Sequence, residues 1–241
     1  YPAVVSNDEL TYEQVRQLNG GFDISLWGNR VSANVDLYRS LTDNLLIYSP
    51  LETHFGYDFR PENGGKMENK GIDAGVFIRL IDRPVFKWDL QASYSTVKNK
   101  VLEIKGDKLV TFLEGVEIVN MPRQPANSFY GYLFEGVNYT SEEAETCDLV
   151  NERLIPFRAG DAKFTDLSGP AGVPDGIIND YDKTVIGTSL PDQFGGLRNT
   201  FTYKRWTLNA FVQFVKGNEV FNYVRYRNES MTGLQNQSAN V

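Results

Sequence analysis

Oxygen-bearing side chains gather between residues 166 and 182 in the types and order of a calcium-binding loop. An EF-hand loop offers oxygen ligands at its first, third, fifth and twelfth positions and has glycine at the sixth. With Asp175 as the fifth position, Gly176 is the sixth, and Asn179 and Asp182 are the ninth and twelfth. The segment from 175 to 182 is therefore in register with a calcium loop.

The first half of the loop is out of register. Asp166 and Ser168 would be the first and third ligands, but the sequence PAGVP at 170–174 separates them from Asp175. Closing a few extra residues costs on the order of 1 kcal/mol, so the excursion can still return Asp175 beside Asp166. Two interpretations stay open: a structural Ca²⁺ ion, which suits oxygen ligands better than Zn²⁺ does, or a turn held by its own hydrogen bonds without metal. The candidate ligands are Asp166, Ser168, Asp175, Asn179 and Asp182, and no cofactor is required.

Catalytic chemistry finds little support in the residue types. His54 is the only histidine, and no nucleophile motif lies near it. Cys147 is expected to be an ordinary packed residue. Aromatic residues in segments 54–60 and 129–136 offer flat rings to a sugar, with loop packing as the alternative. The candidate substrate contacts are His54, Tyr57, Phe59, Tyr130 and Tyr132.

The charge and the length of the apolar runs exclude other classes. With 24 basic and 31 acidic residues the net charge is −7, which disfavours a nucleic-acid partner. No apolar run reaches the roughly 18 residues of a membrane helix. The start, YPAVVSNDEL, contains no visible signal peptide, and a processed or truncated chain would look the same.

Alternation of apolar and polar residues with period two predicts three β-hairpins with short turns. They pair residues 18–27 with 31–38, 70–80 with 86–97, and 195–204 with 206–217. Long loops are expected at 40–66 and 98–192. The second of these contains a possible small hairpin at 108–119 and a short helix at 141–150.

Three features favour a transmembrane β-barrel over a water-soluble sandwich. The alternating segments are about ten residues long, and short turns alternate with long loops. Trp27, Trp88 and Trp206 flank the three short turns, together with Phe86 and Tyr203, as an interfacial aromatic girdle requires. Trp27 falls on the polar row and counts for less. Six strands are fewer than the eight that such a barrel needs, so either further strands are hidden in the loops or the chain is part of a larger barrel.

Five motifs in one order carry a family resemblance over nearly the whole chain. The motifs lie at 63–76, 128–137, 159–187, 191–222 and 229–238. Together they resemble the C-terminal barrel portion of SusC/RagA-type TonB-dependent outer-membrane transporters of Bacteroidota. The family has an uninterrupted Asp-x-Asn-Gly-Asp-Gly run where this chain has its five-residue insertion, and Asp182 is shorter than the usual Glu.

The resemblance implies an all-β fold, with residues 1–241 as a segment of a larger, 22-stranded antiparallel transmembrane barrel with long extracellular loops. It implies no plug domain or TonB box within this segment. The role would be import across the bacterial outer membrane of oligosaccharides or peptides, captured by a SusD-like surface lipoprotein, with TonB acting through the missing N-terminal part. Membrane lipid would surround the barrel, and the 166–182 loop would be an extracellular brace. Because no bond is broken, no enzyme activity is expected. A soluble β-rich carbohydrate-binding module and a small outer-membrane barrel enzyme are the alternatives.

Overall fold

The computed structural model describes residues 4–51, 56–230 and 237, and these form two compact units. The first unit contains residues 4–51, 56–109, 120–126 and 189–220, and the second contains residues 110–119, 127–188 and 221–230. Each unit is described by itself.

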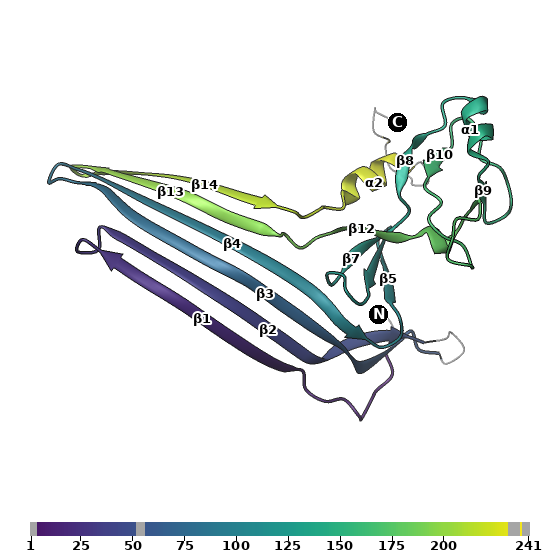
Figure 1. Cartoon of the computed structure of the whole chain (residues 1–241), viewed down its shortest axis with the longest axis horizontal. Coiled ribbons are helices and arrows are strands. Elements are labelled where there is room, and N and C mark those ends of the chain that lie inside the picture. Colours follow the sequence, from purple (N-terminus) through teal and green to yellow (C-terminus); the bar gives the residue numbers. More distant parts are fainter. Residues whose placement is uncertain (1–3, 52–55, 231–236, 238–241) are drawn as a thin grey trace. The chain divides into compact units, whose positions relative to one another are not determined.

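The first unit is built on one six-stranded antiparallel sheet (Figure 1). Its strands follow the order β1-β2-β3-β4-β13-β14, so β1 and β14 are the outermost strands. The bounds are β1 Gln14–Leu26, β2 Val31–Pro50, β3 Phe59–Asp82, β4 Phe86–Ile104, β13 Gln193–Tyr203 and β14 Trp206–Lys216. All three predicted hairpins are confirmed, because β1 pairs with β2, β3 with β4, and β13 with β14.

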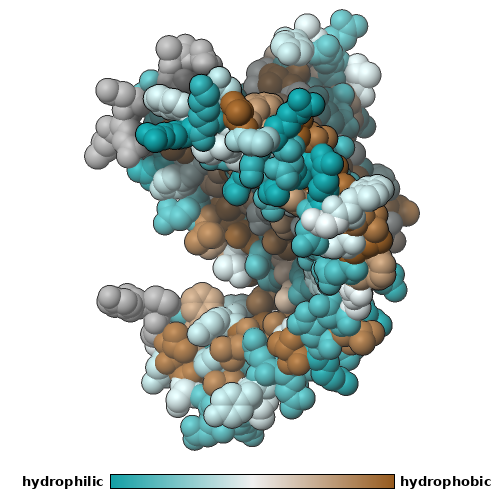
Figure 2. All heavy atoms as spheres, turned by 90° about the vertical axis from the view of Figure 1, so that its left-hand side faces the viewer, coloured by the Kyte–Doolittle hydropathy of each residue, from teal (hydrophilic) through white to brown (hydrophobic). Residues whose placement is uncertain are grey.

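Strand register collects the apolar residues on one face of this sheet. Residues directly opposite each other on paired strands share a face, as do residues two apart on one strand. One complete row across the sheet runs Ile24, Ala33, Val76, Ala92, Leu197 and Val212. Many of these apolar side chains are exposed, and apolar atoms lie open at the surface when the molecule is seen from the short-turn end (Figure 2). An apolar face without a covering layer is the arrangement of a sheet that contacts lipid.

The opposite face of the sheet is polar and closely fitted. Gly75 lies opposite Asn34, and a side chain at this glycine would collide with the Asn34 amide. The Asp36 carboxylate likewise occupies the space that a side chain at Gly21 would need. The absence of side chains at these glycines lets neighbouring polar groups lie flat against the sheet.

Aromatic rings border the apolar face near the short turns. Trp88 stacks on Phe201 with ring centroids 5.5 Å apart, and its indole nitrogen donates a hydrogen bond of 3.1 Å to Asn199 Oδ1. Trp206 lies opposite Tyr203. Trp27 lies in the turn itself with φ of 51°, so it does not continue the row of β1.

The predicted loop at 40–66 is wrong, because β2 continues to Pro50 and β3 begins at Phe59. The predicted loop from residue 98 is also wrong at its start, since β4 continues to Ile104. Beyond the apolar rows, polar side chains occur on both faces of the strands, which removes the alternation. Register shifts between Thr42 and Leu46 further disturb the period.

In its described residues the second unit contains several short strands, two α-helices and one short 3₁₀ helix. Its four-stranded sheet has the order β12-β7-β6-β5, and two-stranded ladders join β10 to β8 and β11 to β9. The strand bounds are β5 Leu109–Leu113, β6 Val116–Asn120, β7 Ser128–Gly131, β8 Phe134–Val137, β9 Val150–Asn151, β10 Ala162–Phe164, β11 Ile177–Ile178 and β12 Thr184–Thr188. The helices are α1 Ser141–Cys147, the short 3₁₀ helix η2 Asp180–Asp182, and α2 Tyr223–Glu229.

The predicted small hairpin at 108–119 and helix at 141–150 are confirmed as β5–β6 and α1. Thr140 and Glu143 start α1 with a capping box, in which each side chain accepts a hydrogen bond from the other residue's backbone amide. Cys147 ends the helix as a half-buried free thiol. Within the described residues, neither α-helix is long and apolar enough to cross a membrane.

Candidate functional site

The loop from residue 166 to residue 182 is organised around one buried carboxylate. Asp182 is fully buried and accepts three backbone hydrogen bonds. The donors are the amides of Leu167 at 2.8 Å, Ser168 at 3.1 Å and Asn179 at 2.8 Å. The carboxylate thereby joins the start of the loop to η2, fourteen and fifteen residues later.

These contacts set the charge state of Asp182. Burial by itself raises the pKa of the carboxyl group, but the hydrogen bonds from the three backbone amides, together with a contribution from the Asp166 side chain, outweigh it and leave the pKa below its ordinary value of 3.8. Asp182 is therefore a carboxylate at neutral pH, solvated by amide groups in place of water.

The five-residue insertion forms a closed turn. The Gly172 amide donates to the Gly169 carbonyl at 2.9 Å, and the Gly176 amide then donates to Asp166 Oδ2 at 2.6 Å. A side chain at Gly169 would collide with the Asp175 carboxylate, so the two residues lie in contact. The excursion thus returns the chain beside Asp166, as the loop-closure argument predicts.

The other candidate ligands also bond to nearby backbone. Asp175 Oδ1 accepts from the Ile177 amide at 3.0 Å, and Asn179 Oδ1 accepts from the Tyr181 amide at 2.9 Å. Both are Asx-type turns. Asp166 Oδ1, in contrast, is buried and lacks a hydrogen-bond partner among the described residues.

The oxygen atoms of the 166–182 loop are the candidate ligands for a metal ion. Across the part of the chain that the structure describes, no group of three or more His, Cys, Asp or Glu side chains is arranged to hold a metal ion. The buried oxygen Asp166 Oδ1, unpartnered within the described residues, suits a cation. A structural Ca²⁺ ion and a turn held by its own hydrogen bonds stay the two alternatives for this loop.

The aromatic candidates occupy different settings. Tyr130 lies in β7 with only 8% of its surface exposed. Tyr132 tilts against Phe164 with centroids 5.4 Å apart. Tyr57 is exposed just before β3, and Phe59 begins β3 opposite Pro50. His54 lies outside the described residues, and substrate contact by these five side chains stays a prediction.

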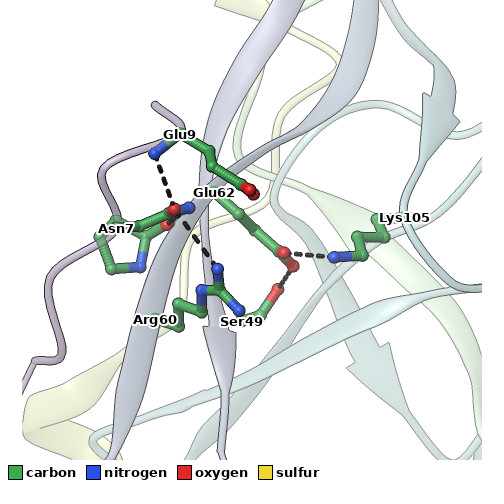
Figure 3. A network of polar contacts seen from close by, with 7 residues as sticks. Asn7, Glu9, Ser49, Arg60, Glu62 and Lys105 are labelled. Atoms are coloured by element: carbon green, nitrogen blue, oxygen red, sulfur yellow. Dashed lines mark hydrogen bonds and ion pairs between the residues drawn. The ribbon is translucent and has the colours of Figure 1, made fainter. Parts of the chain in front are cut away.

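A polar network holds the extended ends of β2 and β3 near Phe59 (Figure 3). Glu62 accepts hydrogen bonds from Ser49 and Lys105, and Asn7 Oδ1 accepts from the Glu9 amide at 3.1 Å and from Arg60 at 3.3 Å. These contacts stabilise the strand pair where it lacks apolar rows.

Lys183 forms a charged cluster that the sequence pattern did not indicate. Its ammonium lies 2.7 Å from Glu117 Oε1, 2.9 Å from Asp180 Oδ1 and 5.5 Å from the centroid of the Tyr132 ring. Burial lowers the pKa of Lys183, but the two carboxylates outweigh it and raise that pKa above its ordinary value. Burial raises the pKa of Tyr132. Since Glu117 lies 66 residues away in sequence, the pairing has no local signal.

Comparison with known proteins decides the family. The family model described as "TonB dependent receptor-like, beta-barrel" matches residues 1–214. The chain belongs to this family of TonB-dependent receptor β-barrels. Its members are receptors and transporters, not enzymes.

Individual relatives agree with this assignment. TonB-dependent receptor P3 of Formosa agariphila is 30% identical over 98% of this chain and 23% of its own length. TonB-dependent receptor SusC of Bacteroides thetaiotaomicron is 24% identical over 89% of this chain and 20% of its own. The solved structure of the RagAB peptide transporter matches with a TM-score of 0.74 at 21% identity, over 95% of this chain and 24% of that one. The family assignment and the fold likeness confirm the predicted barrel segment.

The chain spans about a quarter or less of the length of these relatives. The six-stranded sheet with its two outermost strands is therefore a fragment of a larger TonB-dependent receptor barrel.

Proposed function

We propose that this chain is a wall segment, with its loops, of a TonB-dependent importer in the bacterial outer membrane. The observation that carries the proposal is the apolar band on one face of the six-stranded sheet, combined with the polar opposite face. A membrane barrel needs both faces, since one contacts lipid and the other lines a water-filled interior.

The height of the apolar band supports this placement. On β4 the apolar face runs from Trp88 to the first charged residue, Lys98. Ten residues at the usual rise per residue span about 33 Å along the strand. A strand tilt of roughly 40° reduces this to about 25 Å, the height of the apolar band of an outer-membrane barrel.

The polar face offers a surface for a hydrated cargo. It carries a depression of ≈ 510 Å³ whose lining includes Asp23, Asn34, Asp73 and Gln91. Carboxylates and amides on a barrel interior suit passage of hydrogen-bonding molecules. The cargo we propose is an oligosaccharide or a peptide, delivered by a SusD-like lipoprotein and moved in a TonB-dependent step.

The long connections indicate the outward side. Barrels of this kind have short periplasmic turns and longer extracellular loops. Residues 110–119 and 127–188 of the second unit lie between β4 and β13 in the sequence, and residues 221–230 follow β14, so both parts connect to strand ends opposite the short turns. We place this unit, with the 166–182 loop, outside the cell.

Purification of the full-length protein tests the proposal. We expect it to require detergent, to run as a heat-modifiable barrel, and to co-purify with a SusD-like lipoprotein. Deleting the TonB box is expected to abolish uptake while leaving the barrel folded. A protein that stays monodisperse in plain buffer would contradict the barrel and favour the soluble carbohydrate-binding module.

Calcium removal tests the metal prediction separately. We expect the 166–182 loop to resist protease equally in EDTA and in calcium, because backbone amides already satisfy Asp182. Limited proteolysis at residues 170–174 is the measurement. Protection that is lost in EDTA and restored by calcium, but not by magnesium, would instead establish the ion.

A further inference from the structure

A row of cations crosses three strands on the apolar face of the sheet. Arg39 on β2 lies directly opposite Lys70 on β3, and Lys70 lies opposite Lys98 on β4. Leu18 on β1 completes the row. Because neighbouring strands lie about 4.8 Å apart, the three cationic residues originate within about 10 Å of one another.

The charge of this region is only partly neutralised. In the next row, Glu68 lies opposite Lys100. The Glu68 carboxylate accepts a hydrogen bond from Arg39 Nε at 2.6 Å and lies 3.8 Å from Lys70 Nζ. No ion pair joins Lys98 or Lys100 to another residue of the described ranges. Four cations against one carboxylate leave a local excess of three positive charges.

An apolar groove adjoins the cationic row on its short-turn side. The groove has a volume of ≈ 890 Å³, and Arg39, Lys70 and Lys98 are part of its lining. It opens at Gly20, where a Cβ atom would meet no atom within 4 Å. The apolar part of the lining is formed by Leu18, Phe22, Val35, Leu37 and Ile72.

We propose that this groove binds an anionic, phosphate-bearing lipid of the outer leaflet, with the phosphate at Arg39, Lys70 and Lys98 and an acyl chain along the apolar lining; phosphatidylglycerol serves as the probe for it. The inference rests on the proposed function, in which this face contacts lipid. The cations lie at the end of the apolar band that is farther from the short turns, which is the level of the lipid phosphates. Their long side chains can keep the charge at that level while the stems cover apolar surface.

Charge complementarity favours a lipid over other occupants. Cations next to the hydrocarbon region attract anionic head groups. The groove continues into the apolar rows on the short-turn side. One molecule with a phosphate and a long hydrocarbon chain therefore fits both the cationic row and the apolar lining. Inorganic phosphate would satisfy only the cations.

Lipid retention by the full-length protein tests the site. The protein is reconstituted into nanodiscs of phosphatidylcholine with a minor fraction of phosphatidylglycerol, extracted gently, and analysed by native mass spectrometry. We expect preferential retention of phosphatidylglycerol by the unmodified protein. The triple variant R39Q/K70Q/K98Q is expected to lose this preference by about tenfold or more.

Two further variants separate the parts of the site. G20L fills the groove but keeps the cations, so it is expected to lower phosphatidylglycerol retention as well. The matched control R153Q/R158Q/K163Q removes the same number of positive charges from the second unit, and it is expected to retain the lipid.

The outcomes distinguish this site from the proposed function. Equal retention of phosphatidylglycerol by the unmodified protein and the triple variant, with both inserted and heat-modifiable, would overturn the lipid site alone. Failure of the unmodified protein to insert would overturn the barrel. Full displacement of the lipid by inorganic phosphate would also overturn the site, because the acyl chain would then contribute nothing.

Discussion

Replacing Val212 with arginine is expected to destabilise the membrane-inserted full-length protein by about 2–4 kcal/mol, the cost of a cationic side chain at mid-bilayer on a barrel's lipid face. Val212 lies in β14 opposite Leu197, in the middle rows of the apolar face, and 68% of its surface is exposed. Its side chain lies on the outward apolar face of the strand, so the loss would measure the environment around the side chain. Unfolding of the protein in lipid vesicles, followed by the shift in heat-modifiable electrophoresis, is the measurement.

The adjacent residue provides a matched control. Gln213 occupies the same strand but points to the polar face, opposite Gly196. We expect Gln213→Arg to change the unfolding free energy little, since a charge in a hydrated interior keeps its solvation. Equal destabilisation by the two arginines would contradict the assignment of the faces.

Replacing Asp182 with alanine is expected to open the 166–182 loop without unfolding the barrel. The change leaves the backbone amides of Leu167, Ser168 and Asn179 without acceptors. Each backbone donor left unsatisfied in this partly buried site costs up to about 1–3 kcal/mol. Hydrogen exchange of these three amides in the full-length protein should rise by at least about 100-fold. Asp180→Ala, which removes an exposed carboxylate two residues away, is the control and should leave the exchange nearly unchanged.

Acid should reproduce this effect in the unmodified protein. The folded-state pKa of Asp182 lies below its ordinary value of 3.8. The carboxylate therefore stabilises the loop fully above that value, and the stabilisation is lost as the pH falls through the lower folded-state pKa. Amide exchange, corrected for its intrinsic pH dependence, should stay constant between pH 7 and about 5 and rise only below about pH 4.

The sequence predicted the part of the fold in which one face contacts an apolar environment. Alternation located all three hairpins because Ile24, Val76 and Val212 each require the same side of the sheet. It failed beyond the apolar rows, where β2 carries the continuous apolar run from Leu45 to Tyr48 and β3 carries mainly polar residues and glycine. There the strands are held by ladder hydrogen bonds and by groups such as Glu62, which carry no period.

For the 166–182 loop, the sequence predicted the path of the chain but not the role of Asp182. Closure of the insertion followed from chain statistics, and the hydrogen bond from Gly176 to Asp166 agrees with it. The central role of Asp182 as an acceptor for three amides was not foreseen, because a pattern of ligand types does not distinguish a metal from backbone N–H groups. Helix α2 was also missed, since its exposed Val224 and Tyr226 give no clear helical stripe.

The length of β3 has a mechanical consequence. Its 24 residues form one strand with a register shift between Lys66 and Met67, and the eleven residues from Phe59 to Asn69 precede the cationic row at Lys70. At the usual rise these eleven residues extend about 36 Å along the strand. Paired with β2, they form a stiff post in place of a flexible tether. A molecule that touches the tip of this hairpin would therefore push on the barrel wall directly, and residues inserted at the tip would lengthen the post without disturbing the lipid-facing rows.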